Sequence, residues 1–503
     1  MLWKTLTSIL LLNISIHAQE GTLSLLVTEK EKSEALPCRV HLKNASGKFV
    51  EAPGLPYWKN HFSCNGKVEL KLPAGTYTYS IERGPEYTAA KGTVEIKDAT
   101  PAQLKLEIER ITDMAADGWW SGEMHVHRPM EEAELLMQAE DLHIAHFITW
   151  WNAANPWAKA STPPDGVPVK FGANYFYDRF GGEDEREGGA LLFLNLHRTI
   201  NVQDALDHYP PSNNYAKQAR KLKKDVWIDA EKPYWWDFPL WIAESSVDTV
   251  GIANNHMQQF GMLDNESRGK PRDLERYPDK HGNGLWTQDI YYHLLNCGIH
   301  MPPSAGSASG VLWNPVGYNR IYANLDGEFT YEKWHEAVLA GRTFVTNGPL
   351  LICKADDKFP GHVFRADPKK TIPLNIRLHS SDRIRVIEVI QNGEIIHSVP
   401  CEGTLQSLPN IALKPGWFLV RCIADVPETF RFASTAPYYV EAADGKPVIS
   451  RTSAQFFLDW CKEREARYKA IPEATDAQKN ETLELWKKAD AFWADKVLQA
   501  NAK

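Results

Sequence analysis

Apolar and polar residues alternate along much of the first hundred positions of the chain. Residues 76–81 and 103–108 both show a period of two, which buries one face of a β-strand and leaves the other in solvent. The segment Leu72-Pro73-Ala74-Gly75 predicts a turn between two strands, because proline fixes one φ and glycine tolerates the opposite sign. These patterns predict a small β-domain over residues 19–112.

The pattern changes over residues 113–350, where short apolar runs alternate with longer segments compatible with helices. The apolar runs are 145–149, 190–196, 226–229 and 247–253, and one of the helical segments is 129–142. This rhythm is typical of a β-α-β-α chain whose strands form a parallel barrel or sheet. Such folds place their chemistry at the carboxyl ends of the strands, and polar residues follow the runs here.

Residues 351–450 return to a strand pattern. Asn392-Gly393 lies between two apolar runs, which predicts a β-hairpin with a type I′ turn. Residues 451–503 have helical periodicity, and their apolar side chains are spaced on one face, so we expect these helices to dock on the body of the protein. Capping boxes are expected at Thr452 with Gln455 and at Thr475 with Gln478.

Residues 1–18 predict a signal peptide. Lys4 precedes an apolar stretch from Leu6 to Ile16, and Ala18 is a small residue before a cut at Gln19. The stretch is shorter than a membrane span, and no later segment reaches the roughly 18 apolar residues that a spanning helix needs. We therefore expect a secreted or periplasmic protein with no integral membrane segment after signal cleavage; an uncleaved anchor is the alternative.

Composition narrows the classes of partner. The 503 residues include 56 Lys and Arg against 64 Asp and Glu, which gives a net charge of −8. Because no basic block is present that could neutralise phosphates, we expect no nucleic-acid partner. Of the seven cysteines, we expect Cys38 to pair with Cys64 and Cys401 with Cys422, and the other three to be buried thiols.

The sharpest chemical signal is the segment Gly122-Glu123-Met124-His125-Val126-His127. Residues i and i+2 of a strand face the same side, so His125 and His127 project together. Two imidazoles that face one point suit a divalent transition metal. Taken alone, the pair is weak evidence for a metal site, because two surface histidines are the more frequent explanation.

Further segments follow this pair in a fixed order. They are the acidic cluster 183–187, Asp229-Ala230-Glu231-Lys232-Pro233, a strand ending in His256, Ala305-Gly306-Ser307-Ala308-Ser309, and residues 340–349. The series resembles the PHP superfamily (polymerase and histidinol phosphatase domain), in particular its exported CehA/McbA-type metallohydrolases. The resemblance implies a distorted (β/α)7 barrel over residues 113–350, with a metal site at the carboxyl ends of its strands.

The resemblance extends to the parts around the barrel. Residues 60–64 and 83–87 are similar to the carboxypeptidase-regulatory-type β-domain that precedes the barrel in some members. The implied fold class is therefore α/β, a PHP-like barrel flanked by an N-terminal β-sandwich, a C-terminal β-domain at 351–450 and a helical tail at 451–503.

The chain departs from the family pattern at several ligand positions. Where such enzymes carry Thr-Asp-His-Asn at the second strand, this chain has Thr149-Trp150-Trp151-Asn152. Three more ligand positions hold Ala190, Lys232 and Gly251, and the final Ser-Asp-x-His is Ser307-Ala308-Ser309-Gly310. A trinuclear metal centre cannot be assembled from the residues that remain.

What remains is a smaller candidate site. The metal ligands that the resemblance implies are His125, His127, Glu183 and His256, next to Glu185 and Glu187. They would hold one divalent ion (zinc, manganese or iron), or two at most, with an open position for water. The catalytic candidates are Glu231 as the base that orients water, Lys232 as the group that stabilises developing negative charge, and Asn255.

Two features have more than one interpretation. The ammonium of Lys232 either supplies the positive charge of a lost metal or pairs with Glu183 or Glu231. Trp150 and Trp151 are adjacent on a strand and face opposite ways, so at most one of them lines the pocket. That indole would either stack on a ligand ring or fill the vacated metal space.

We expect an exported metal-dependent hydrolase that acts on a phosphoester, a carbamate or another ester, including one derived from a carbohydrate. The alternative is a catalytically degenerate barrel that binds a glycan or another ligand through tryptophan-lined loops. The lost Asp and His positions favour the alternative, and the intact HxH pair favours the hydrolase.

Overall fold

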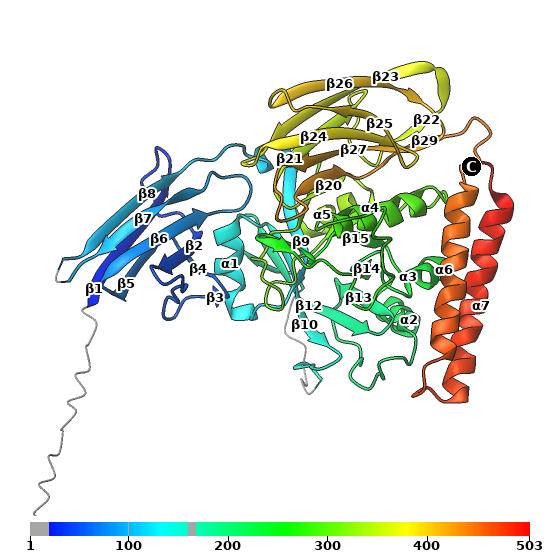
Figure 1. The fold of residues 1–503 in the computed structure, drawn as a ribbon, viewed down its shortest axis with the longest axis horizontal. Helices are drawn as coiled ribbons and strands as arrows, with labels where there is room; N and C mark the ends of the chain where they lie inside the picture. Colours follow the sequence, from blue (N-terminus) through cyan, green and yellow to red (C-terminus); the bar gives the residue numbers. More distant parts are fainter. Residues whose placement is uncertain (1–19, 99, 159–166, 503) are drawn as a thin grey trace, which may run out of the picture. The chain divides into compact units, whose positions relative to one another are not determined.

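The structure is a computed structural model that describes residues 20–98, 100–158 and 167–502. It divides the chain into two compact units, whose elements are labelled in Figure 1. The first unit is the chain up to Ile81 together with Ala89–Ile108, and the second is Glu82–Thr88 together with Glu109–Lys503. The predicted signal peptide lies outside the described residues. The three successive parts predicted at 113–350, 351–450 and 451–503 all belong to the second unit.

The first unit is built from two sheets. One sheet has the order β5 (Lys67–Pro73), β1 (Glu20–Glu29), β8 (Ala102–Ile108). The other has the order β3 (Tyr57–Trp58), β4 (His61–Cys64), β2 (Cys38–Asn44), β6 (Gly75–Glu82), β7 (Ala90–Ile96). The strands predicted at 76–81 and 103–108 are confirmed as β6 and β8. The predicted turn near Gly75 joins β5 to β6 and thereby links the two sheets.

The two predicted disulfides are not formed. All seven cysteines are free thiols. Cys38 and Cys64 lie opposite each other on β2 and β4, but their Sγ atoms are 3.9 Å apart, which is a thiol contact and far longer than an S–S bond. The Sγ atom of Cys401 lies 3.7 Å from the carbonyl of Gly403, and Cys422 is a buried thiol.

The second unit is organised around one long mixed sheet of sixteen strands. Its first part has the order β18 (Pro303–Ala305), β15 (Thr249–Ala253), β14 (Trp227–Ala230), β13 (Gly189–Leu194), β12 (Tyr175–Arg186), β10 (Ile144–Trp151), β9 (Trp119–Val126), with β11 (Val169–Phe171) beside β12. Strands β9, β10 and β12 are parallel, and so are β14, β15 and β18. The four predicted apolar runs are confirmed as β10, β13, β14 and β15.

The expectation of a parallel arrangement over 113–350 is wrong at β19 (Arg320–Asn324), which is antiparallel to β9 and to β20 (Thr343–Thr346), and at β13. This strand is antiparallel to both β12 and β14. The reason is local, because the turn at Glu187 and Gly188 joins β12 directly to β13, and so short a connection can only make a hairpin.

Helices and short 3-10 turns connect the strands. They are η1 (Ala115–Asp117), η2 (Met130–Glu132), α1 (Ala133–Glu140), α2 (Ser212–Leu222), α3 (Phe238–Ala243), α4 (Gly282–Leu295) and α5 (Tyr331–Leu339). The helical segment predicted at 129–142 is thus η2 followed by α1. A small hairpin, β16 (Met257–Gln258) with β17 (Gly261–Met262), follows β15.

The same long sheet continues into the part predicted as the C-terminal β-domain. After β9 come β19 (Arg320–Asn324), β20 (Thr343–Thr346), β28 (Phe432–Thr435), β27 (Gly416–Ala424), β24 (Ile384–Gln391) and β25 (Glu394–Val399), with β29 (Tyr438–Glu441) and β22 (Val363–Arg365) alongside. A separate sheet has the order β21 (Leu350–Ala355), β23 (Asp367–His379), β26 (Leu405–Leu413). The predicted hairpin is confirmed between β24 and β25, where Asn392 and Gly393 both have positive φ, 52° and 86°.

The chain ends in two helices that lie side by side, α6 (Arg451–Lys469) and α7 (Asp476–Gln499) (Figure 1). The capping box at Thr475 is confirmed, whereas α6 is capped by Ser450 because Thr452 already lies inside the helix. Trp460 and Trp493 are fully buried, which confirms the expected docking. Among the described residues, no helix has the length and apolar character needed to cross a membrane. The fold is mixed α/β with more strand than helix.

Candidate metal centre

The HxH pair lies where β9 ends. His125 is the penultimate residue of β9 and His127 follows its last residue. Their backbone is fixed by the segment after β18, because the carbonyl of His125 accepts from the Ala308 N–H at 2.8 Å and the His127 N–H donates to the Ser309 carbonyl at 2.7 Å. Gly306 permits this close approach, since a Cβ there would lie 2.6 Å from Cβ of His125.

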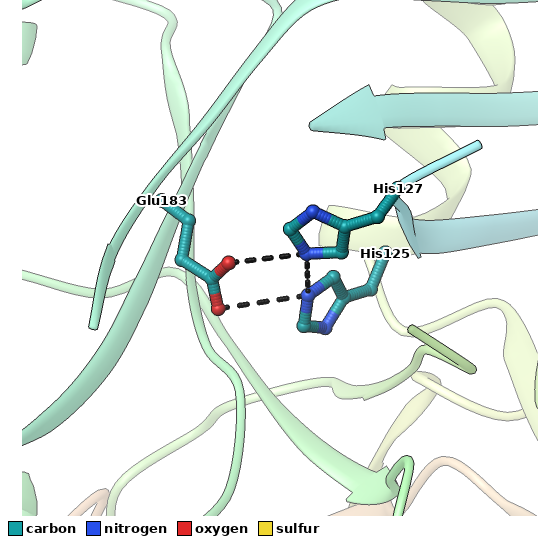
Figure 2. A group of neighbouring side chains, drawn as sticks. All are labelled: His125, His127 and Glu183. Carbon is teal, nitrogen blue, oxygen red and sulfur yellow. Dashed lines mark hydrogen bonds and ion pairs between the residues drawn. The ribbon is translucent and has the colours of Figure 1, made fainter. Parts of the chain in front are cut away.

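Glu183 from β12 completes a group of three, and its carboxylate faces both imidazole rings (Figure 2). The two Nε2 atoms of His125 and His127 are 2.9 Å apart. The Glu183 oxygens lie 3.5 Å from Nε2 of His125 and 3.2 Å from Nε2 of His127. In the described part of the chain this is the one cluster of His, Cys, Asp and Glu side chains close enough together to share an ion.

The donor atoms fit one divalent transition metal. Tetrahedral zinc with bonds of about 2.0–2.1 Å holds its ligand atoms about 3.3 Å apart. The two Nε2 atoms are 2.9 Å apart, and one Glu183 oxygen lies 3.5 Å from that of His125 while the other lies 3.2 Å from that of His127. Imidazole nitrogens and a carboxylate oxygen are also ligands that manganese and iron accept. Three protein ligands leave a coordination position open.

The electrostatics of this group favour a cation. Burial opposes the charge of His125, but the adjacent carboxylates of Glu183 and Glu231 outweigh it and raise the pKa of the ring to about 10. Burial also opposes the charge of Glu183, yet the two histidines hold the pKa of its carboxyl well below the ordinary range. Without a metal ion, a proton must therefore supply the positive charge that the carboxylates demand.

Glu231 lies on the other side of His125, directly after β14. Its Oε1 is 3.3 Å from Nδ1 of His125 and accepts from Nδ2 of Asn255 at 2.5 Å. Its Oε2 contacts Nζ of Lys232 at 2.6 Å and accepts from Nε1 of Trp235 at 3.2 Å. Burial would raise the pKa of Glu231, but Lys232 and His125 lower it to about 2. Both oxygens of this carboxylate are fully engaged.

Of the two ion-pair partners considered for Lys232, the structure brings Glu231 next to it. The Lys232 side chain is 4% exposed and its ammonium also lies 4.5 Å from the centre of the Trp235 ring. Asn255 is likewise buried, and its Oδ1 has no hydrogen-bond partner within the described residues. Asn255 lines the cavity, but this oxygen is itself closed off from solvent.

His256 lines the same cavity but is not part of the group of three. Its Nδ1 donates to the carbonyl of Asn265 at 2.8 Å, and its Nε2 accepts from Oγ of Ser267 at 3.3 Å. Burial and the neighbouring charge of Lys232 lower the pKa of His256 to about 3, so its ring is neutral. Its role as a fourth ligand stays a prediction, and it would require Ser267 to release Nε2.

A cavity of about 340 Å³ connects these residues. Its walls are formed by His125, His127, Trp151, Glu183, Glu185, Glu231, Lys232, Asn255, His256, Leu263, Ser267, Ala308, Val311 and Leu312. All seven sequence-predicted site residues therefore face one space. Leu263, Ser267 and Val311 were missed, because they lie in loops whose sequence carries no period or motif that marks them.

Glu185 is the cavity-lining acid that reaches solvent, with a side chain that is 47% exposed. Burial of part of the carboxyl and the charges of Glu183 and Glu231 raise its pKa to about 7. Its backbone N–H donates to Oδ1 of Asn152 at 2.7 Å, and Nδ2 of Asn152 donates to Asp184 at 2.8 Å, so Asn152 holds this stretch of β12. Glu187 lies outside the cavity lining.

The prediction that at most one of two adjacent tryptophans lines the pocket is confirmed. Trp150 is fully buried and donates from Nε1 to the carbonyl of Phe180. Trp151 lines the cavity and meets the His127 ring edge to face, with the ring centres 5.6 Å apart.

Comparisons with known proteins leave the chain without an assigned family. No family model matches it, and no curated protein matches it. Among solved structures it is similar to the chain titled "The Bacillus anthracis TIE protein", with 20% identical residues and a TM-score of 0.15. That match covers 22% of this chain and 19% of the other, so the shared part is about a fifth of that protein's length. A likeness of this size carries no argument about fold or function.

Proposed function

We propose that this protein is an exported metal-dependent hydrolase of the PHP and CehA/McbA type. The observation that carries the proposal is the meeting of His125, His127 and Glu183 around one point in a cavity that also holds Glu231 and Lys232. Export rests on the sequence of residues 1–18 and is tested by the N-terminal mass of the mature protein.

We further propose that residues 113–350 form the distorted (β/α)7 barrel that the sequence resemblance implies. The support for a closed barrel is that the segment after β18, the last strand of the series, lies next to the first strand, β9. Val126 of β9 pairs with Ser309 in a parallel bridge there. The buried carboxylate of Glu123 on β9 accepts from the backbone N–H groups of Ser307 and Gly317, which ties the same segment to β9 a second time. The site then lies at the carboxyl ends of β9, β12, β14 and β15, as such folds require.

His125, His127 and Glu183 would hold the ion, which when bound supplies Lewis-acid polarisation and lowers the pKa of water in the site. The Glu231 carboxylate lies 3.3 Å from Nδ1 of His125 and would orient the ring once the ion is bound, in the manner of the carboxylates that orient metal-bound histidines. Lys232 holds Glu231 in turn and contributes positive charge to the cavity wall.

The contacts of Glu231 support an orienting role better than the role of a base, because both of its oxygens are occupied. Glu185 faces the same cavity and has a pKa near 7, which suits a group that accepts a proton at neutral pH. In this proposal Glu185 takes the proton from the attacking water, and Asn255 holds Glu231 in place through its Nδ2.

The charge of the cavity does not separate the substrate classes. The carboxylates of Glu183, Glu185 and Glu231 line it beside the ammonium of Lys232. A bound divalent ion and this ammonium would together balance the three negative charges. The proposed substrates are therefore phosphoesters, carbamates and other esters, including those derived from a carbohydrate.

The test is metal content together with turnover. Wild-type protein purified without chelator should carry about one zinc, manganese or iron per chain, and His125→Ala with His127→Ala should lose it, because two of three ligands are gone. His197→Ala is the control, since His197 is exposed and lies outside the cavity. Unchanged metal content in the folded double variant would sink the site assignment.

The second candidate, a non-catalytic ligand-binding barrel, is favoured by the aromatic wall that Trp151 adds to the cavity. It predicts glycan binding that Trp151→Ala abolishes, with no turnover in an ester and carbamate screen. Metal-dependent turnover in that screen would decide for the hydrolase.

A further inference from the structure

Three chain segments that build the cavity rest on one face of the C-terminal helix α6. The first is the turn between β12 and β13, which follows the strand that carries Glu183 and Glu185. The second is the segment from Glu231 to Asp237, and the third is the loop that holds His256 through Asn265 and Ser267. The side chains on this face of α6 are Trp460, Glu463, Arg464 and Arg467, which repeat at helical spacing.

Arg464 joins the first two segments. Its guanidinium donates from Nη1 to Oε1 of Glu187 at 2.8 Å and from Nη2 to the other oxygen of the same carboxylate. Its Nε donates to Oδ1 of Asp237 at 2.7 Å. The Arg464 side chain is 2% exposed, so the guanidinium makes its three charge-assisted hydrogen bonds from a buried position, although Glu187 is 25% exposed.

The segments that Arg464 joins are also packed without space between them. The Asp237 N–H donates to the carbonyl of Gly188 at 2.9 Å. A Cβ on Gly188 would lie 2.1 Å from the Asp237 carboxylate, and one on Gly189 would lie 2.4 Å from Cβ of Trp235. Trp235 donates a hydrogen bond to Glu231, so a movement of Gly189 against Trp235 would displace Glu231 in the wall of the cavity.

The third segment meets the same helix through Lys270. Its ammonium lies between two indoles, 5.6 Å from the ring centre of Trp236 and 5.4 Å from that of Trp460, and it pairs with Glu463. Arg467 covers Trp236 from α6 at 4.2 Å. The helix thus contacts the segment that follows Glu183 and the segment that follows Glu231, which lie on the two sides of His125.

We propose that Arg464 is a positioning residue for the metal centre, acting through Glu187 and Asp237 to hold Glu183 and Glu231 at their distances from His125. The inference rests on the proposed function, since it concerns the same ion. The guanidinium acts as a bidentate bridge, so its geometry is required in addition to its charge. A lysine at this position would neutralise one carboxylate and leave the other unbridged.

The experiment compares Arg464→Lys and Arg464→Met with the wild-type full chain. The matched control is Arg421→Met, because Arg421 is equally buried and pairs through Nε and Nη2 with Glu388, away from the cavity lining. Zinc affinity is measured by competition with a chromophoric chelator, and the visible absorption of the cobalt-loaded protein reports ligand geometry. All measurements are made well below the lowest melting temperature.

We expect both Arg464 variants to bind zinc at least about tenfold more weakly and to change the cobalt spectrum, while Arg421→Met keeps wild-type values. If Arg464→Met does not fold, the zinc affinity and cobalt spectrum of Arg464→Lys by themselves test the inference. Wild-type affinity and spectrum in Arg464→Lys would overturn the inference and leave the proposed function standing.

A measurement that needs no metal distinguishes failure of the proposed metal site from failure of the positioning role of Arg464. Hydrogen exchange of the metal-free chain should be faster in Arg464→Lys than in wild type over residues 181–194 and 227–238, and unchanged there in Arg421→Met. If wild-type protein binds no metal, the proposed function fails, and unchanged exchange in Arg464→Lys would then overturn the positioning role as well.

Discussion

Lys232 and Glu231 form an ion pair in which both side chains are about 5% exposed or less. Removing one partner of such a pair leaves a buried charge without compensation. We predict that Lys232→Met lowers the free energy of unfolding by about 3–5 kcal/mol, and that adding Glu231→Gln restores most of it. Thermal melting of the single and double variants checks this.

Activity is measured on the same Lys232→Met samples. If the ammonium also stabilises charge in the reaction, turnover per folded molecule falls by about 10²–10³. If the melting temperature of Lys232→Met equals that of wild type, the ion pair with Glu231 does not contribute to the stability of the fold, and the prediction is wrong.

His146 is a second residue whose environment yields a prediction. It is fully buried, donates from Nδ1 to the Glu123 carbonyl at 3.0 Å and meets Nε2 of His335 at 3.1 Å. Burial lowers its pKa from the ordinary 6.5 to about 4, so the folded protein keeps it neutral. Between these two pKa values the unfolded chain binds the extra proton, and stability is lost as the pH falls.

We predict that this residue alone removes about 2 kcal/mol of stability between pH 7 and pH 5. Urea unfolding at the two pH values should show a smaller loss in His146→Gln than in wild type. The same loss in both proteins would contradict the pKa shift.

At the scale of elements, the hairpin of β12 and β13 depends on glycine at its turn. Gly189 has a φ of 124° and lies against Trp235, so a side chain there meets both backbone strain and a clash. We predict that Gly189→Ala costs about 1–3 kcal/mol and weakens metal binding, because the hairpin carries Glu183. Melting and metal titration measure the two effects.

Gly403→Ala is the matched control for this prediction. A Cβ at Gly403 meets no atom within 4 Å, so stability there should change by less than about 0.5 kcal/mol. Equal effects at both glycines would show that the turn is not specifically constrained.

At the scale of the whole molecule, the candidate site lies entirely within the second unit. A ligand at one hundred times its dissociation constant stabilises the folded state by about 2.7 kcal/mol. For a unit of roughly 400 residues this corresponds to a rise in melting temperature of about 3 °C. Calorimetry with and without zinc should show that rise for the second unit, and protection from hydrogen exchange there but not in the first.

Local patterns in the sequence were sufficient for features that depend on neighbouring residues. The Asn392-Gly393 hairpin needs two positive φ angles that those residues supply, and the capping box at Thr475 is complete within four residues. The projection of His125 and His127 from one side of β9 follows from the period of a strand. Each of these rests on backbone geometry over a short stretch of chain.

Contacts between distant segments were decided by the tertiary structure. Lys232 could have paired with Glu183 or Glu231, and the choice depends on how β12 and β14 are spaced by the antiparallel β13. The same spacing brings Glu183 to the two histidines. Contacts within loops leave His256 with Asn265 and Ser267, and the pairing of β2 with β4 in the first unit keeps Cys38 and Cys64 in contact without a bond. The sequence by itself determined which side chains can carry the chemistry, and only packing between strands and loops decided which of them meet, because those distances are set by the whole core.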